Sequence, residues 1–350
     1  MANISNAEFI RQNNADSSIF FDINPIRSYN RVLNFVVGAR GIGKTFSFKE
    51  WGVRDFLATG NQFIYMRRFE KELINRKAKE GFFPRDLKEK FPGHVLEFKD
   101  GAYLCDGKIC GYPMVLSKAG QEKGIIEYDN VTKVLFDEFI IDKRNYHYLP
   151  DETSIFKEAM VTIARMRFVQ FFLMANATTW NNPYFIKYKI QKPNSDDEFI
   201  KSKSWVVQLP KQTEYKAIAE QSPLGKLFKD IDSEYFDYAY DNKLFRDNED
   251  FLEKRTEDSK PIFCFKFEGN KVSIWYDFKD AVMYCSEKNL PDDFRTYVVS
   301  QADHTEKTIM LFGTKPQLVK LFMEFFKNGR VRFETERVKG ITYDIIRKLM

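Results

Sequence analysis

GARGIGKT, at residues 38–45, satisfies the pattern G-x-x-x-x-G-K-[ST] at every fixed position. A nearly continuous apolar run, RVLNFVV at 31–37, precedes it, and helix-compatible sequence at 45–58 follows. In such a loop the backbone amides turn toward phosphate oxygens, and the helix presents its positive end. A glycine-rich turn that matches by chance is the alternative, and the strand before the loop and the helix after it argue against that.

We therefore predict a nucleotide site for ATP in this loop. Lys44 reaches the β- and γ-phosphates, and the Thr45 hydroxyl binds Mg²⁺. The residues predicted to bind the nucleotide are Gly38, Ala39, Arg40, Gly41, Ile42, Gly43, Lys44 and Thr45.

An acidic pair ends a second apolar strand, VLFDE at 134–138, about ninety residues after the loop. The carboxyl ends of parallel strands meet at one edge of a sheet, so this pair is expected beside the phosphates. Asp137 would hold Mg²⁺ through water, and Glu138 would polarise the attacking water as general base. The alternative is a pair that caps the next turn. Adjacent Asp and Glu favour a hydrolase over a small-molecule kinase.

Two further polar positions belong to the same region of the chain. The apolar strand 171–175 ends at Asn176, whose side chain would sense the γ-phosphate, with a turn-forming Asn as the alternative. The preceding helix, 152–167, ends with Arg165 and Arg167. An arginine there can reach a neighbouring subunit's γ-phosphate, and a solvated charge at the helix end is the alternative.

Basic residues also follow the second predicted strand, QFIYMR at 62–67. Arg67, Arg68 and Lys71 open a segment that stays basic to Lys79. Beside a sheet edge such residues suit phosphate contacts with DNA, and a solvated helix face is the alternative.

Composition limits the classes of protein. The net charge of +5, from 55 basic and 50 acidic residues, permits a polyanionic partner without arguing for one. The four cysteines include no CxxC pair, so neither a zinc site nor a disulfide framework is expected. No apolar stretch approaches 18 residues, which predicts a chain that neither spans a membrane nor is secreted, in a reducing cytoplasm.

Buried strands that alternate with helices predict an α/β fold, with a largely parallel sheet covered by helices. DG turns at 100–101 and 106–107 predict short antiparallel strands within 95–116. From Pro261 the pattern changes to a hairpin, PIFCFKF and VSIWYDF, followed by further strands and helices. The expected domains are an N-terminal leader (1–28), a P-loop ATPase domain (29–210), a linker or helical subdomain (211–256) and a second α/β domain (257–350).

The strings RVLNFVVGARGIGKT, QFIYMRRFEKEL, KVLFDEFI and NNPYF resemble the genome-packaging ATPases of small, protein-primed tailed phages, the phi-twenty-nine-like group, which are related to the large-terminase ATPases. The resemblance spans about residues 27–350 and is weaker beyond 210. It implies an additional-strand, conserved-Glu ATPase domain, a linker and a C-terminal RNase H-like domain.

The family assembles as a homopentameric ring on the portal of a prohead, inside the host cell, and drives double-stranded DNA inward. Whether a prohead-associated RNA joins the motor stays open. The resemblance places a trans-acting arginine at Arg165, and a second trans-acting basic residue at Lys123. At the family's basic position in the DNA-facing loop this chain has Glu70, with Lys71 next.

In the C-terminal hairpin, Lys266 and Phe267 stand where an active RNase H-like nuclease needs a carboxylate. Asp277 and Glu287 complete no set of three, so we expect a domain without nuclease activity that binds DNA or RNA. Two alternatives to a packaging motor are a ring helicase or remodelling ATPase, and a non-hydrolysing nucleotide-binding assembly factor. Glu138 argues against the last, because binding alone needs no base.

Overall fold

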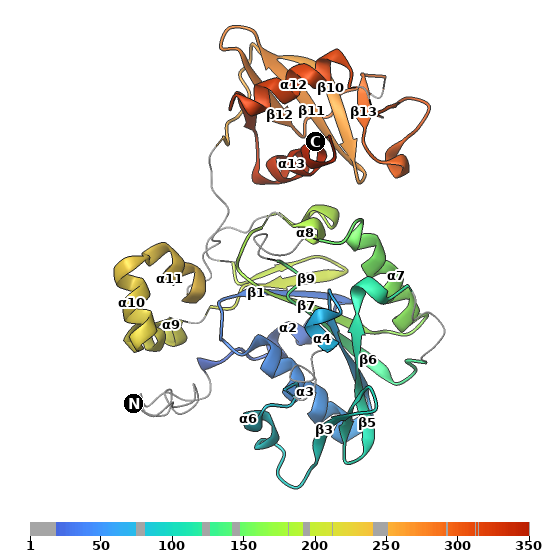
Figure 1. Cartoon of the computed structure of the whole chain (residues 1–350), viewed down its shortest axis with the longest axis vertical. Helices are drawn as coiled ribbons and strands as arrows, with labels where there is room; N and C mark the ends of the chain where they lie inside the picture. Colours follow the sequence, from blue (N-terminus) through green and yellow to red (C-terminus); the bar gives the residue numbers. More distant parts are fainter. Residues whose placement is uncertain are drawn as a thin grey trace. The chain divides into compact units, whose positions relative to one another are not determined.

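A computed structural model describes residues 19–74, 81–120, 127–141, 148–180, 182–191, 197–211, 213–240, 251–291, 293–311, 313 and 315–349. The chain divides into two compact units (Figure 1). Unit 1 comprises 1–179 and 193–245, and unit 2 comprises 180–192 and 246–350.

Unit 1 contains a nine-stranded sheet in the order β3-β4-β5-β2-β6-β7-β1-β9-β8. Its strands are β1 (Leu33–Gly38), β2 (Gln62–Arg67), β3 (Leu96–Lys99), β4 (Ala102–Cys105), β5 (Lys108–Val115), β6 (Val131–Asp137), β7 (Gln170–Asn176), β8 (Phe199–Lys201) and β9 (Trp205–Gln208). The pairs from β5 through β2, β6, β7 and β1 to β9 are all parallel. This confirms the α/β fold with a largely parallel sheet.

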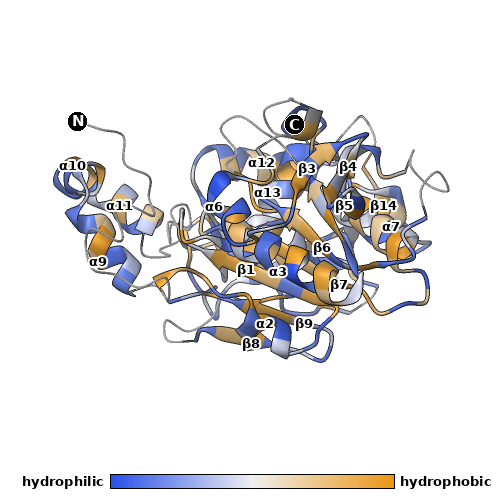
Figure 2. Ribbon diagram, turned by 90° about the horizontal axis from the view of Figure 1, so that it is seen from below, coloured by the Kyte–Doolittle hydropathy of each residue, from blue (hydrophilic) through white to orange (hydrophobic). Residues whose placement is uncertain are grey.

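Strand β7 lies between β1, which leads into the phosphate loop, and β6, which ends in the acidic pair. This is the extra strand that the resemblance implies. All six residues of β1 are buried, as expected for a strand covered on both faces. Figure 2 shows apolar residues concentrated on β1 and β7.

The helices of unit 1 are mostly short. They are α2 (Asn24–Ser28), α3 (Lys44–Thr59), α4 (Lys71–Ile74), α6 (Arg85–Lys88), α7 (Glu152–Ala164), α9 (Thr213–Gln221), α10 (Pro223–Ile231) and α11 (Ser233–Tyr240), with a 3-10 turn η2 (Leu116–Lys118). The predicted DG turns join β3 to β4 and β4 to β5, with positive φ at Asp100 and Asp106. These strands are antiparallel as predicted, and β5 also pairs parallel with β2.

Unit 2 contains a six-stranded sheet in the order β14-β13-β10-β11-β12-β15. Its elements are α8 (Pro183–Lys187), β10 (Lys260–Phe267), β11 (Asn270–Asp277), β12 (Val282–Ser286), β13 (Thr296–Val298), η3 (Gln301–Asp303), β14 (Ile309–Met310), α12 (Gln317–Lys327), β15 (Val331–Phe333) and α13 (Glu336–Leu349). An antiparallel meander, β10 to β12, is flanked by parallel pairs. Helices α12 and α13 supply buried residues to its core.

Three stretches differ from the expected domains. The expected linker, 211–256, is divided between the units, with 211–245 in unit 1 and 246–256 in unit 2. Residues 19–28 are more than a leader, because Phe21, Ile23 and Ile26 are buried in the core of unit 1. Residues 180–192, expected in the ATPase domain, belong to unit 2, where Ile186 joins the hydrophobic core. Among the described residues, no helix has the length and apolar character needed to cross a lipid bilayer.

Candidate functional site

The phosphate loop joins β1 to α3 and depends on two glycines in the left-handed region. Gly41 has φ of 76° and Gly43 has φ of 84°. Gly43 is the N-cap of α3, so the helix begins at Lys44 and its first amides face the loop. The sequence folds here as predicted for a phosphate-binding loop, with the positive end of a helix behind it.

Lys44 is folded back onto its own loop. Its Nζ donates to the carbonyl oxygens of Gly38 at 3.0 Å and Ala39 at 2.6 Å. Burial lowers the pKa of Lys44 to about 8, against a smaller opposing effect of the Asp137 carboxylate. A buried ammonium held only by neutral oxygens has much to gain from a bound anion.

Thr45 and Asp137 form the second feature of the site. The Thr45 hydroxyl lies 3.0 and 3.1 Å from the two carboxylate oxygens of Asp137. The Tyr65 hydroxyl, from the end of β2, donates to Asp137 Oδ2 at 3.0 Å. These oxygens fit a hard cation such as Mg²⁺, which binds through few protein ligands and keeps several waters. Tyr65 was missed from the sequence, since only the pairing of β2 with β6 brings it here.

Glu138 is the first residue after β6, which ends at Asp137. Its φ is 60°, a left-handed conformation uncommon outside glycine, and its amide donates to the Met174 carbonyl oxygen at 2.8 Å. The side chain is 55% exposed and accepts from Arg67 at 2.7 Å. Arg67 also pairs with Glu72 at 2.8 Å and lies 3.6 Å from Asp137. The Glu138 carboxylate is therefore held by the Arg67 side chain and remains open to solvent.

Asn176 ends β7 at the same sheet edge, opposite Gly38 in the parallel register. Its Oδ1 accepts from Lys44 Nζ at 3.3 Å. The structure thus brings together the loop, the acidic pair and the strand-end amide, three segments separated by about ninety and forty residues in sequence.

The two candidate arginines differ sharply. Arg167 donates to four backbone carbonyl oxygens, those of Tyr128, Asp129, Val131 and Ile163, at 2.6 to 2.8 Å. Arg165 is exposed and has φ of 48° at the C-cap of α7. Its neighbours Met166 and Phe168 are also exposed, Met166 fully. The Arg167 guanidinium is bonded within its own chain, whereas Arg165 lies beside the exposed apolar side chains of Met166 and Phe168.

The structure places Arg68, one of the residues predicted to contact DNA, inside unit 1. This side chain is buried, pairs with Glu152 at 2.8 and 3.0 Å, and donates to the carbonyl oxygens of Glu138 and Phe139. Arg67 is committed to the acidic groups described above. Lys71 is exposed at the start of α4. Lys123 lies outside the described residues.

The acidic groups of unit 2 are held separately. Asp277 is buried and accepts from the Thr256 hydroxyl and the amides of Lys279 and Asp280, bonds that lower its pKa. Glu287 pairs with Arg337. In the described part of the chain, three close metal-binding side chains occur together once, at the β3–β4 edge of unit 1 (His94, Cys105 and Asp106).

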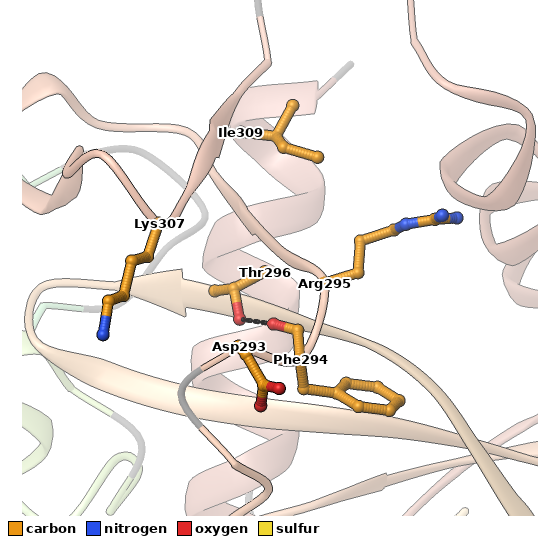
Figure 3. A pocket seen from close by; sticks show the side chains of 6 residues that line it. All are labelled: Asp293, Phe294, Arg295, Thr296, Lys307 and Ile309. Carbon is orange, nitrogen blue, oxygen red and sulfur yellow. Dashed lines mark hydrogen bonds between the residues drawn. The ribbon is translucent and has the colours of Figure 1, made fainter.

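A shallow pocket of about 440 Å³ also opens in unit 2, beside β13 and β14 (Figure 3). Six residues line it: Asp293, Phe294, Arg295, Thr296, Lys307 and Ile309. The Thr296 hydroxyl donates to the Phe294 carbonyl oxygen at 2.8 Å. The lining mixes an acidic group with two basic ones, so it forms no uniformly positive surface.

Comparison with known proteins adds an independent finding. The sequence model of the family described as podovirus DNA encapsidation protein (Gp16) matches residues 15–350. The DNA packaging protein of Bacillus phage phi29 is 32% identical over 336 residues, which cover 95% of this chain and 99% of that protein.

Two solved structures are similar as well. The bacteriophage Phi-29 viral genome packaging motor assembly matches with a TM-score of 0.75 and 29% identity, over 95% of this chain and 100% of that one. The N-terminal domain of the DNA packaging ATPase from bacteriophage phi29 matches with a TM-score of 0.52 and 35% identity, over 56% of this chain and 99% of that one.

Proposed function

This chain belongs to the podovirus DNA encapsidation protein family, and from that premise we infer that it is an ATP-driven DNA packaging protein of a phage motor. The observation that carries the ATPase proposal is the meeting of three segments, the phosphate loop and the ends of β6 and β7, at one sheet edge. Lys44, Thr45, Asp137 and Asn176 are joined there by hydrogen bonds of 3.0 to 3.3 Å.

Lys44 would bind the phosphates. In place of the carbonyl oxygens of Gly38 and Ala39 its ammonium would take phosphate oxygens, which are charged acceptors and make stronger bonds. Thr45 and Asp137 would hold Mg²⁺, which supplies charge neutralisation on the phosphates when bound. Asn176, within reach of Lys44, would distinguish the occupied from the empty γ-phosphate position.

Glu138 would act as general base. Its carboxylate is exposed enough to meet a water molecule, and its bond to Arg67 holds it beside β2. To orient water at the phosphates, Glu138 must release Arg67. The ion pair with Arg67 is therefore the position of the carboxylate before nucleotide binds. A general base that is paired with Arg67 until nucleotide binds suits an enzyme that hydrolyses ATP only after binding it.

Arg165 would serve a neighbouring subunit. It precedes β7, a strand about 20 Å long that ends at Asn176, so it lies near the opposite end of the sheet from the phosphate loop. Its own chain's phosphates are therefore out of reach. Heterologous contacts between identical subunits close into a ring, here a homopentamer as the resemblance implies. Exposed Met166 and Phe168 support an interface at this end.

The remaining partners are double-stranded DNA and the portal of the prohead, with the motor bound there inside the host cell. Of the three residues first proposed for DNA, exposed Lys71 stays a candidate. We propose no nuclease activity, because Asp277 and Glu287 serve turns and an arginine pair in unit 2.

The test is packaging itself. Purified proheads supplied with this protein, duplex DNA and ATP should protect full-length DNA from added nuclease. Lys44→Ala protein should protect none, while Glu72→Gln protein, altered at an acid that bonds Arg67 outside the phosphate site, should still package. ATP turnover without any protected DNA would favour a remodelling ATPase or helicase.

A further inference from the structure

Two aromatic side chains lie directly against the glycines of the phosphate loop. A Cβ built on Gly41 would collide with the hydroxyl oxygen of Tyr215, on α9. A Cβ built on Gly43 would lie 3.5 Å from Cδ1 of Phe20. Both rings are half-buried, and their centroids are 6.3 Å apart with planes tilted by 49°. They come from segments almost two hundred residues apart and lie next to each other at one loop.

Backbone hydrogen bonds fix both segments to the loop. The amide of Phe21 donates to the Ile42 carbonyl oxygen at 2.8 Å, next to Phe20. The amide of Arg40 donates to the Ala239 carbonyl oxygen at 2.9 Å, which ties α11 to the loop. Tyr215 reaches α11 as well, because its ring centroid is 6.4 Å from that of Tyr240. The two rings are thus positioned by their surroundings.

We propose that Phe20 and Tyr215 form the subsite for the nucleobase of the bound triphosphate. The inference rests on the proposed nucleotide function of the loop, whose amides and Lys44 account for the phosphates alone. The base must lie beyond the phosphate cradle, and these are two partly exposed rings beside that cradle. Aromatic rings bind bases by stacking, since every base has a π-face.

The chemistry of Tyr215 suits this position. Burial raises the pKa of its hydroxyl to about 12, with a smaller contribution from Tyr240. The hydroxyl is neutral at physiological pH, as an ordinary tyrosine is, and does not repel the phosphates. A base stacked on Tyr215 would also contact α9, which packs against α10 and α11.

The test separates the base from the phosphates. Binding of ATP and of inorganic tripolyphosphate, which has no base, is measured by calorimetry for the full-length protein. Tyr215→Leu should weaken ATP binding about 5- to 150-fold, the range for loss of one base–aromatic stack, and change tripolyphosphate binding less than twofold. Phe20→Leu should act in the same direction. Tyr215→Phe, which keeps the ring, should bind ATP like the unaltered protein.

Tyr112→Leu is the matched control, because Tyr112 lies on β5 and packs against Tyr128 away from the loop. Thermal melts identify any variant that fails to fold, and Phe20→Leu then carries the test. If Tyr215→Leu and Phe20→Leu keep the unaltered preference for ATP, or lose both ligands equally, the base subsite is refuted. If the unaltered protein binds neither ligand, the proposed ATPase function fails first.

Discussion

The acidic side chains of the two units differ in what holds them. In unit 1, Asp137 and Glu138 accept hydrogen bonds from side chains, those of Thr45, Tyr65 and Arg67. In unit 2, Asp277 and Asp303 each accept from two backbone amides of tight turns, and Asp277 also accepts from the Thr256 hydroxyl. A side-chain donor can rotate away when a cation or water arrives, whereas a turn amide cannot leave without unfolding the turn.

Carboxylates held by side-chain donors suit a catalytic role, whereas carboxylates held mainly by turn amides stabilise the fold. Asp137 and Glu138 gather at one edge with a lysine and an amide, and Glu138 is open to solvent. Asp277 and Asp303 are buried and separate.

Removal of the proposed base should have the largest effect. Glu138→Gln should lower ATP turnover by about 10²–10⁴-fold and leave ATP binding intact, because a general base acts in the chemical step. Lys44→Ala should abolish ATP binding in addition to turnover, since Lys44 stabilises the phosphate charge of bound ATP before the chemical step. Steady-state turnover and calorimetric binding check both. Near-normal turnover by Glu138→Gln protein would remove Glu138 from the role of base.

The same contrast between an accessible charge and a charge held by the backbone applies to Arg165 and Arg167. Arg165→Ala should lower turnover of assembled rings by about 10³-fold and leave the melting temperature unchanged. Arg167→Ala should instead cost about 2 kcal/mol or more of the free energy of unfolding, because four carbonyl oxygens lose a charged donor. Turnover and thermal melts on both variants check the contrast.

Mixed rings decide whether Arg165 acts in trans. Subunits carrying Arg165→Ala keep a good base, and subunits carrying Glu138→Gln keep a good arginine. With random mixing in equal amounts, roughly a quarter of the interfaces join the two intact groups, so activity should recover. Absence of recovery in rings shown to be mixed would transfer the role to another basic residue, with Lys123 the next to test.

Much of this site could be predicted from the sequence, because its residues directly follow strands that the local sequence pattern identifies. The loop, the acidic pair and Asn176 each follow directly on a buried apolar strand, and parallel strands place their ends together. Strands β1, β6 and β7 lie within three residues of their predicted limits. The glycines of the loop were required by the same pattern.

What the sequence did not reveal depends on distant partners. The basic run at 67–71 gives no sign that Arg68 is buried, because its partner Glu152 is 84 residues away. Tyr65 and Arg67 reach the acidic pair through the pairing of β2 with β6. Residues 180–192 carry apolar side chains that fit either unit, and only packing assigns Ile186 to unit 2.

The pH dependence of nucleotide binding should show a smaller effect. Without nucleotide the pKa of Lys44 is about 8, so its ammonium is mostly charged at pH 7 and mostly neutral at pH 9. A bound triphosphate favours the charged form, so affinity should fall about tenfold between these values. The unfolded pKa is 10.5, so the nucleotide-free protein should gain stability as pH rises through 8 to 10.5.

Lys49 is the matched control for this titration. Burial lowers its pKa to about 8 as well, and its Nζ donates to the Phe82 carbonyl oxygen at 2.9 Å. Lys49→Met should keep the tenfold fall in affinity if Lys44 causes it. A flat profile in the Lys49→Met protein would assign the effect to Lys49.

The smallest effect is expected at Asp277, where the two kinds of carboxylate are compared most directly. Asp277→Asn keeps the shape of the side chain but removes the charge that Thr256 and the amides of Lys279 and Asp280 bond. Weaker turn bonds should lower the melting temperature by a few degrees, about 2–8 °C, and leave ATP turnover unchanged. Incubation of the full-length protein with plasmid DNA and Mn²⁺ should give no cleavage before or after the substitution, because a two-metal reaction needs several carboxylates around both ions. Cleavage that disappears in Asp277→Asn protein, with the fold intact by thermal melt, would show that a turn-bound carboxylate serves chemistry and that the distinction between the two units fails.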